Sequence, residues 1–330
     1  MITQSELKQL KTGDEINHFF IITKFEIKLT KTNKEYLNLE LRDKSASVPA
    51  KVWDNIDNIK NKITEGDIVK IAGLMEEFNN QPQIKITSIR PVKDDENISH
   101  SDFLPKSKRI LDEMLNEFES RIEKINNPFL IQLTKNIFNQ NNFSKYTKAP
   151  AGKAWHHSYV HGLLEHTLEI IKICDLMCDV HPELNRDLLI CGAMLHDFGK
   201  TEELQFDKNF DYTDKGKLLG HIVIAAMEIE KEIMKISDFP SDLRNQLIHL
   251  VLSHQGKYEY ASPVEPKTLE AIVLYHADEL SAKTNAYKSA IQNDENTGNN
   301  WTRYLPLANT SLYIPPNDAQ EDKPKETLFD

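Results

Sequence analysis

A His-Asp pair that follows an apolar run restricts the fold of this chain more than any other feature. The run covers residues 191–195 and has the composition of a buried helix, and His196 and Asp197 follow it directly. An imidazole nitrogen and a carboxylate oxygen from adjacent residues can bind one divalent metal ion, and the carboxylate can bridge to a second ion. A fold that uses this pair must bring further ligands to the same interior point.

Further residues of the ligand type are spread along the chain in a similar setting. Each of them lies in or beside an apolar segment with helical spacing: His166, His221, His254 and Asp278. A helical bundle brings side chains from several such segments to one point. A single histidine on an apolar helix is usually a packed or surface residue, so it is the whole set that indicates a metal site.

The order H…HD…H…H…D resembles that of the metal-dependent HD-domain phosphohydrolases. The resemblance implies one ion bound by His166, His196, Asp197 and Asp278, with Asp197 bridging to a second ion held by His221 and His254. Nitrogen and carboxylate ligands point to Mn²⁺, with Fe²⁺, Mg²⁺ and Co²⁺ as alternatives, rather than to a thiolate-rich zinc site. Two such ions can clamp a phosphate and activate a water. Asp197 and Lys200 are the expected catalytic residues, with Lys200 reaching a phosphate oxygen or orienting the water.

The N-terminal part of the chain has a different periodicity. Residues 16–92 alternate with period two, which predicts strands. We expect Phe19, Ile21, Phe25, Ile27 and Leu29 to form the apolar face of the first strand. Three strands, a short helical segment at 55–64 and two more strands follow the order of a five-stranded OB-fold β-barrel. The predicted fold is therefore multidomain, with an OB-fold barrel followed by an all-α HD-domain bundle.

The predicted outer face of this barrel carries aromatic rings and lysines. Tyr36, Lys51 and Trp53 lie on the second and third strands, and Phe78 lies near the last hairpin. The binding surface of OB-folds lies mainly on those strands and their loops. Rings with lysines between them are suited to stacking single-stranded bases and attracting phosphates. In the alternative interpretation, Trp53 and Phe78 cap the barrel core.

Residues just before the first ligand segment are candidates to bind the substrate's phosphate or base. A basic stretch at 143–153 ends at Lys153, and four further candidates follow: His156, His157, Tyr159 and His161. A surface cap is the alternative role for this cluster.

Composition divides the whole chain into a barrel at 1–93, an acidic linker at 94–105, a helical part at 106–292, and an extension at 293–330 that is expected to be partly disordered.

The charge balance excludes one class of nucleic-acid binder. The chain carries 40 Lys and Arg against 51 Asp and Glu, a net charge of −11, which argues against coating of duplex nucleic acid. The 3 cysteines lie in apolar patterns and predict free thiols. The chain shows no signal peptide and no apolar run long enough to cross a bilayer, so we expect a cytoplasmic protein without a membrane partner.

The pairing of an OB-fold with an HD domain resembles the YhaM-type 3′→5′ exoribonucleases over about residues 12–292. The motifs that carry the resemblance are HHSY at 156–159 and GLLEHT at 162–167. It implies metal-dependent hydrolysis from the 3′ end of single-stranded RNA, and also of single-stranded DNA. Two other functions remain open: an HD-type phosphohydrolase of nucleotides or cyclic nucleotides, and a non-enzymatic OB-fold single-strand-binding protein. The oligomeric state also remains open, a homo-oligomer included.

Overall fold

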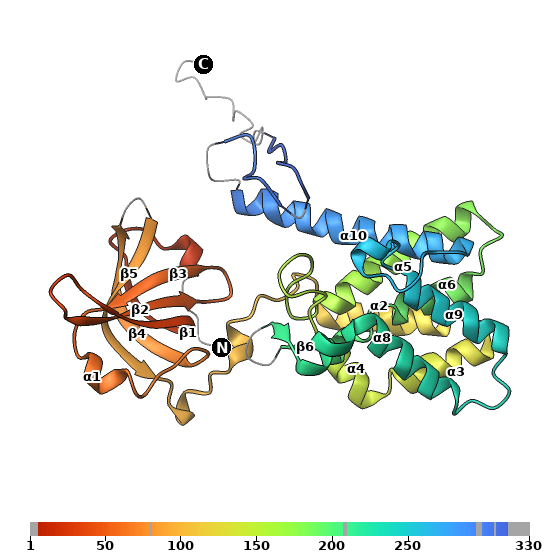
Figure 1. The fold of residues 1–330 in the computed structure, drawn as a ribbon, viewed down its shortest axis with the longest axis horizontal. Coiled ribbons are helices and arrows are strands. Elements are labelled where there is room, and N and C mark those ends of the chain that lie inside the picture. The colour runs from red at the N-terminus through yellow and green to blue at the C-terminus, as the bar shows by residue number, and fades with distance from the viewer. Residues whose placement is uncertain (1–5, 79–80, 207–209, 295–298, 307, 316–330) are drawn as a thin grey trace, which may run out of the picture.

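Two bodies with separate hydrophobic cores make up the chain. The computed structural model describes residues 6–78, 81–206, 210–294, 299–306 and 308–315. Figure 1 shows a β-barrel, in red and orange, next to a helical bundle, in yellow to blue. The barrel core and the bundle core contain no common residue. This is the predicted combination of a barrel and an all-α bundle.

Five strands close the barrel in the order β1-β2-β3-β5-β4. Their bounds are β1 (Glu15–Leu29), β2 (Glu35–Arg42), β3 (Ser47–Val52), β4 (Ile68–Phe78) and β5 (Gln81–Pro91), with α1 (Ile56–Ile59) between β3 and β4 and a short 3₁₀ turn (Leu7–Gln9) before β1. β1 pairs with both β2 and β4, and β3 pairs with β5 in parallel. The predicted OB-fold order of three strands, one helix and two strands is confirmed.

The prediction for the apolar face of β1 is wrong over part of its length. Phe20 and Ile22 point into the barrel core, whereas Ile27 and Leu29 are exposed. A β-bulge between Ile22 and Lys24 shifts the register of the β1–β2 pair. Because a one-residue shift moves every later side chain to the opposite face, the single alternation read from the sequence could not hold on both sides of the bulge.

The first residues after the barrel cover the other face of β1. Phe19, Ile21 and Ile68 form a second small cluster with Phe103, and Val92 and Ile98 pack against it. The segment that follows β5 contains two short 3₁₀ turns, Asp94–Glu96 and His100–Asp102. The predicted linker region is therefore packed onto the barrel through its apolar residues, and both faces of β1 are buried near residue 20.

The bundle consists of helices that surround one large apolar core. Their bounds are α2 (Leu111–Glu123), α3 (Pro128–Ile137), α4 (Gln140–Tyr146), α5 (Gly162–Val180), α6 (Arg186–Leu195), α7 (Lys200–Glu203), α8 (Asp214–Ile233), α9 (Ser241–Ser253) and α10 (Leu269–Asp294), with a small hairpin of β6 (Leu204–Gln205) and β7 (Asp211–Tyr212). Every buried position of α6 from Leu188 to Leu195 contributes to this core or its packing. α6 thus brings its C-terminal end, where His196 follows, into the interior of the bundle.

Beyond the bundle, α10 extends past the other helices, and residues 299–306 and 308–315 fold back at its end (Figure 1). Asp294, at the end of α10, accepts a hydrogen bond from the main-chain N–H of Arg303 at 2.8 Å. The predicted disorder of the final stretch concerns residues 316–330, which lie outside the described residues. Among the described residues, no helix combines the length and the apolar composition that crossing a bilayer requires.

Candidate metal centre and strand-binding face

The ligand-type residues predicted from the sequence meet in the interior of the bundle, around Asp197. They come from different elements: His166 from α5, His196 and Asp197 from the turn after α6, His221 from α8, His254 from the C-terminal end of α9, and Asp278 from α10. Asp197 is 1% exposed, and His166, His196 and His254 are fully buried. We refer to these six residues as the Asp197 cluster.

The Nε2 atoms of all the histidines in this cluster face the carboxylate of Asp197. Their distances to its nearer oxygen are 3.7 Å for His166, 3.2 Å for His196, 3.4 Å for His221 and 3.6 Å for His254. Asp278 Oδ1 lies 3.0 Å from His166 Nε2. One carboxylate thus lies between ring nitrogens from opposite sides of the bundle.

The second nitrogen of each ring fixes which tautomer is present. Nδ1 of His196, His254 and His221 donates, respectively, to the carbonyl of Ala193 at 2.8 Å, the carbonyl of Val251 at 2.7 Å and the carboxylate of Glu203 at 3.0 Å. Carbonyl and carboxylate oxygens only accept hydrogen bonds, so Nδ1 must carry the hydrogen. In a neutral ring Nε2 is then left with a lone pair, and this lone pair is directed at Asp197.

His166 reaches the same tautomer through a longer chain of contacts. The Ser281 hydroxyl donates to Glu169 Oε2 at 2.7 Å, so it accepts from His166 Nδ1 at 3.0 Å. His157 lies behind this pair, fully buried, with its Nε2 3.3 Å from Glu169 Oε2. The structure therefore places His157 in the support of His166 rather than at a surface that a substrate can reach.

Gly199 allows α8 to approach the turn that carries His196 and Asp197. A methyl group added at this glycine would lie 2.0 Å from the carbonyl oxygen of His221 and 2.9 Å from the main-chain nitrogen of Ala225. Neither main-chain atom can move without displacing α8. The absence of a side chain at position 199 is thus what lets His221 reach the Asp197 cluster.

Lys200 is the cation that accompanies Asp197. Its Nζ lies 2.6 Å from Asp197 Oδ2, and the residue is 6% exposed. Burial by itself raises the pKa of Asp197, but the positive charges around it, with that of Lys200 the largest, outweigh that effect and hold the pKa well below its usual range. Burial also lowers the pKa of His254 to about 4, and the nearby His196 adds to this shift. The carboxylate is therefore ionised and the His254 ring neutral near pH 7, as metal ligation requires.

The donor set fits a divalent metal. Several buried polar atoms of the cluster have no hydrogen-bond partner among the described residues: Nε2 of His166, His196 and His221, and Oδ1 of Asp197. Leaving such atoms unpaired is costly, so their convergence needs an explanation. Ligand atoms lie within 4.8 Å of one another in two groups, His166 with His196 and Asp197, and Asp197 with His221 and His254. A bound cation would interact favourably with both the ring lone pairs and the Asp197 carboxylate.

A cavity of about 220 Å³ opens beside the Asp197 cluster. Its lining includes Lys200, His254 and Asp278 together with Trp155, His156, Tyr260 and Tyr275. Of the substrate-binding candidates predicted in this half of the chain, His156 lines the cavity. The others have different partners: Lys153 pairs with Asp211 at 2.8 Å, Tyr159 accepts from Asn285 at 3.3 Å, and His161 donates to the carbonyl of Thr147.

The two tyrosines of this cavity and the outer residues that hold the histidines are not among the residues predicted from the sequence. Tyr275 precedes Asp278 by one helical turn, and that spacing was a usable signal. Tyr260, Glu203 and Ser281 carry no such signal. Each reaches its position through tertiary contacts between segments that the sequence alone does not bring together.

The candidates on the barrel gather into one patch, which we call the strand-binding face: Tyr36, Lys51, Trp53 and Phe78. The rings of Tyr36 and Trp53 stack with centroids 4.6 Å apart and an interplanar angle of 22°. Lys51 Nζ lies 5.6 Å from the Trp53 ring centroid and 4.6 Å from that of Phe78. The described barrel core includes neither Trp53 nor Phe78, and Phe78 is 55% exposed. The patch therefore offers aromatic surface to a ligand.

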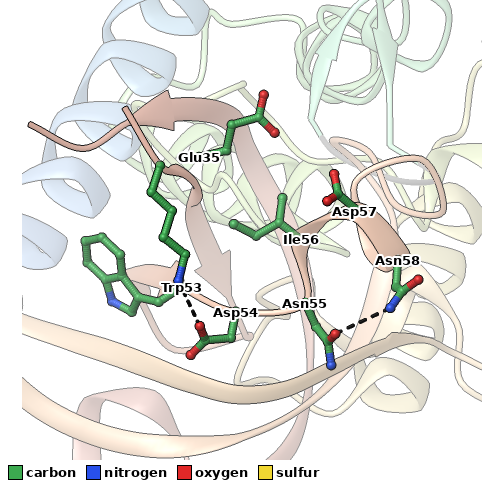
Figure 2. Close-up of a pocket in the computed structure, with 8 residues that line it drawn as sticks. Glu35, Trp53, Asp54, Asn55, Ile56, Asp57 and Asn58 are labelled. Atoms are coloured by element: carbon green, nitrogen blue, oxygen red, sulfur yellow. Dashed lines mark hydrogen bonds and ion pairs between the residues drawn. The ribbon is translucent and has the colours of Figure 1, made fainter. Parts of the chain in front are cut away.

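An acidic pocket adjoins this face. Figure 2 shows the Trp53 indole along one side of the pocket, with Asp54, Asn55 and Asp57 among the other residues that line it. Its volume is about 510 Å³. Carboxylates repel phosphates, so the backbone of a bound strand is expected to follow the Lys51 side of Trp53 rather than this pocket.

Replacing Glu203 with alanine is expected to weaken divalent-metal binding by about 10- to 100-fold, the usual cost of losing an outer partner of a metal ligand. Glu203 accepts from both the main-chain N–H of His221 at 2.9 Å and its Nδ1 at 3.0 Å. Isothermal titration with Mn²⁺ measures the change. Glu203→Gln keeps an acceptor oxygen and should retain most of the affinity. Glu202→Ala, on the surface beside it, is the matched control, and equal affinity in Glu203→Ala would contradict the assignment.

Both the barrel and the bundle are similar to known protein domains. An OB-fold nucleic acid binding domain matches residues 21–92, and an HD domain matches residues 163–283. The chain is 32% identical to the 3′-5′ exoribonuclease YhaM of Bacillus subtilis over 305 residues, which are 92% of this chain and 96% of that protein. It is also 32% identical to the YhaM of Bacillus velezensis over 307 residues, with the same coverage of each chain.

Among solved structures, the bundle is similar to the HD domain of the Listeria monocytogenes phosphodiesterase PgpH. The match has 16% sequence identity and a TM-score of 0.29, and it covers 48% of this chain and 86% of that one.

Proposed function

We propose, from the premise that this chain belongs to the family of YhaM 3′-5′ exoribonucleases, that it removes nucleotides from the 3′ end of single-stranded RNA by metal-dependent hydrolysis. The observation that carries the proposal is the convergence of ring nitrogens from four helices on the buried carboxylate of Asp197, beside an open cavity. A phosphodiester in that cavity would lie against both the Asp197 cluster and Lys200.

The site is proposed to hold two divalent ions, with Mn²⁺ as the first choice and Fe²⁺, Mg²⁺ or Co²⁺ as alternatives. His166, His196, Asp197 and Asp278 would hold one, and Asp197, His221 and His254 the other; the overlap of the two ligand groups at Asp197 supports this division. Bound ions would supply Lewis acidity toward the phosphate and a water of lowered pKa.

The chain's own residues have two further tasks in this proposal. Lys200 holds the ionised form of Asp197 and presents a buried ammonium to the cavity, where it attracts a non-bridging phosphate oxygen. The strand-binding face holds the upstream part of the strand through stacking on Trp53 and Phe78. Stacking and phosphate contacts do not need the 2′-hydroxyl, so single-stranded DNA is proposed as a second substrate.

The proposed division of the chain follows from the separate cores. A barrel at 1–93 would bind the strand, and a helical part at 106–292 would cut it. The connection at 94–105 includes Phe103 and Leu104, which are 3% and 1% exposed. Residues 293–330 form the proposed C-terminal extension, and the described part of it packs at the end of α10.

A time course on 5′-labelled single-stranded RNA tests the proposed function. With Mn²⁺ we expect a ladder of products that shorten from the 3′ end, and with chelator we expect an intact strand. An intact strand under Mn²⁺, together with hydrolysis of mononucleotides or cyclic nucleotides, would instead favour a small-molecule phosphohydrolase. Strand binding without hydrolysis of any of these would favour a binding protein.

Replacing Trp53 with alanine is expected to weaken single-stranded RNA binding by roughly 5- to 150-fold, since one base stack contributes about 1–3 kcal/mol. Fluorescence anisotropy in chelator measures binding without cleavage. Trp301→Ala is the matched control, because Trp301 is 53% exposed but lies in the C-terminal extension. Equal loss in the two variants, or none in Trp53→Ala, would contradict the role of the strand-binding face.

A further inference from the structure

The cavity beside Asp197 is lined by two chemically different sets of side chains. One set is polar and consists of groups of the Asp197 cluster, Lys200 and His156, and Glu279 and Lys283 also line the cavity. The other set is aromatic and includes the rings of Tyr260 and Tyr275. The volume of about 220 Å³ is below the roughly 300–1,000 Å³ typical of pockets for drug-sized ligands. A ligand of the size of one nucleotide, with an anionic and an aromatic part, matches these features.

The polar set contains an unused pair of hydrogen-bonding atoms. His156 lines the cavity, and neither of its buried ring nitrogens has a hydrogen-bond partner among the described residues. Its ring centroid lies 5.1 Å from that of His166. A neutral imidazole can donate one hydrogen bond to a phosphate oxygen. His156 and Lys200 thus define where the phosphate of a bound nucleotide would lie.

Both tyrosines of the aromatic set belong to segments that carry ligand residues or closely follow one. Tyr275 precedes Asp278 by one turn of α10, and Tyr260 lies in a 3₁₀ turn (Tyr258–Tyr260) that closely follows His254. Their positions relative to the Asp197 cluster are therefore set by the same helices. Tyr260 is 49% exposed, which leaves ring surface open to a ligand.

Gly256 fixes the position of the Tyr275 ring. A methyl group added at this glycine would lie 2.2 Å from Cε2 and 2.4 Å from Cδ2 of Tyr275. Its φ angle of +79° is also one that residues with side chains rarely adopt. The tyrosine ring therefore rests against bare main chain directly after His254, and its place in the cavity depends on a glycine at position 256.

We propose that Tyr260 and Tyr275 form the base subsite for the 3′-terminal nucleotide, with the scissile phosphate beside His156 and Lys200. This inference rests on the proposed function and specifies how its cutting site holds the strand end. The subsite recognises a nucleobase by its aromatic face, so it accepts all four bases and discriminates against a sugar phosphate that has no base. The strand-binding face and this subsite then hold the two ends of the bound segment independently.

The test compares two small probes on the full chain with Mn²⁺: adenosine 5′-monophosphate and ribose 5-phosphate. They share the sugar phosphate and differ in the base. Isothermal titration should show the nucleotide binding roughly 5- to 150-fold more tightly, the value of about one base stack. Equal affinity of the wild-type chain for the two probes would overturn the proposal without reference to any variant.

Variants then assign the preference to the two rings. In Tyr260→Ala/Tyr275→Ala the affinity ratio should fall to about one. In Tyr260→Phe/Tyr275→Phe it should persist, because phenylalanine keeps the ring and loses only the hydroxyl. Tyr258→Ala is the matched control, since Tyr258 shares the 3₁₀ turn but is absent from the described cavity lining. Circular dichroism and Mn²⁺ content verify that each variant is folded.

Two results with the variants would overturn the assignment. One is an affinity ratio in Tyr260→Ala/Tyr275→Ala that equals the ratio of the wild-type chain. If Trp155→Ala then removes the preference, it belongs to another ring of the same cavity. The other is loss of the preference in the double phenylalanine variant, which would show that hydroxyl hydrogen bonds carry it. The RNA time course distinguishes these failures from failure of the proposed function: a chain that shortens RNA but binds both probes equally keeps the function and loses the subsite.

Discussion

Replacing Asp197 with asparagine should reduce the turnover of single-stranded RNA by about 1,000-fold or more, at the upper end of what one electrostatic group in an active site supplies. The amide has nearly the same shape as the carboxylate but removes the charge that both candidate ligand groups share. It also places an NH₂ group toward ring nitrogens at 3.2–3.7 Å. Neither ion position would then retain a full set of ligands.

Three measurements separate this effect from general damage. Single-turnover cleavage of 5′-labelled RNA gives the loss of rate, and inductively coupled plasma mass spectrometry gives the bound metal. Anisotropy in chelator should show unchanged strand binding, because the strand-binding face lies in the separate barrel. Asp242→Asn, at an exposed aspartate of α9, is the control. Wild-type cleavage in Asp197→Asn would contradict the metal assignment.

Lys200→Met should lower the rate of cleavage by about 100- to 1,000-fold, the usual loss when one group that stabilises the transition state is removed. Methionine keeps an apolar stem of similar length and removes only the ammonium. That ammonium lies 2.6 Å from Asp197 and lines the cavity, so it can contact a phosphate that is bound beside the Asp197 cluster. The affinity for RNA should change much less, because in the proposed function the barrel holds the upstream part of the strand.

Lys200→Met also removes the counter-ion of a buried carboxylate, and this loss should lower the thermal stability of the chain. Without metal the variant should melt at a lower temperature than the wild-type chain, and Mn²⁺ should reduce the difference. Lys215→Met, at a surface lysine 3.8 Å from Glu202, is the control for both readouts. A cleavage rate equal to that of the wild-type chain would exclude Lys200 from the chemistry.

The parts of this fold that depend on residue type and order could be predicted from the sequence. The order of three strands, a helix and two strands predicted the barrel. This order could be read from the sequence because period-two alternation is a local property. The His and Asp residues were identified as a set because each kept the same setting beside an apolar helix. The prediction for the apolar face of β1 was wrong because the bulge depends on the pairing of β1 with β2, which alternation does not reveal.

The surroundings of the metal centre could not be predicted, for a related physical reason. His156 and His157 are both predicted substrate contacts because they stand just before the first ligand segment, yet the two rings lie in different environments. His156 lines the cavity, while His157 pairs with Glu169 behind His166. A positive φ of 43° at His157 turns the chain between them. Adjacent residues in a loop can therefore have different partners, and only the three-dimensional path distinguishes them.

The separate cores of barrel and bundle have a consequence for how the chain denatures. Cooperative unfolding requires a continuous set of contacts, and the two described cores have no residue in common. Heating should therefore produce two transitions, and a single melting temperature would not describe the molecule. A ligand stabilises only the unit whose native form it binds. Divalent cations would raise the transition of the bundle, and an oligonucleotide held by both halves would raise both transitions, so the thermogram itself would report which half of the molecule each ligand occupies.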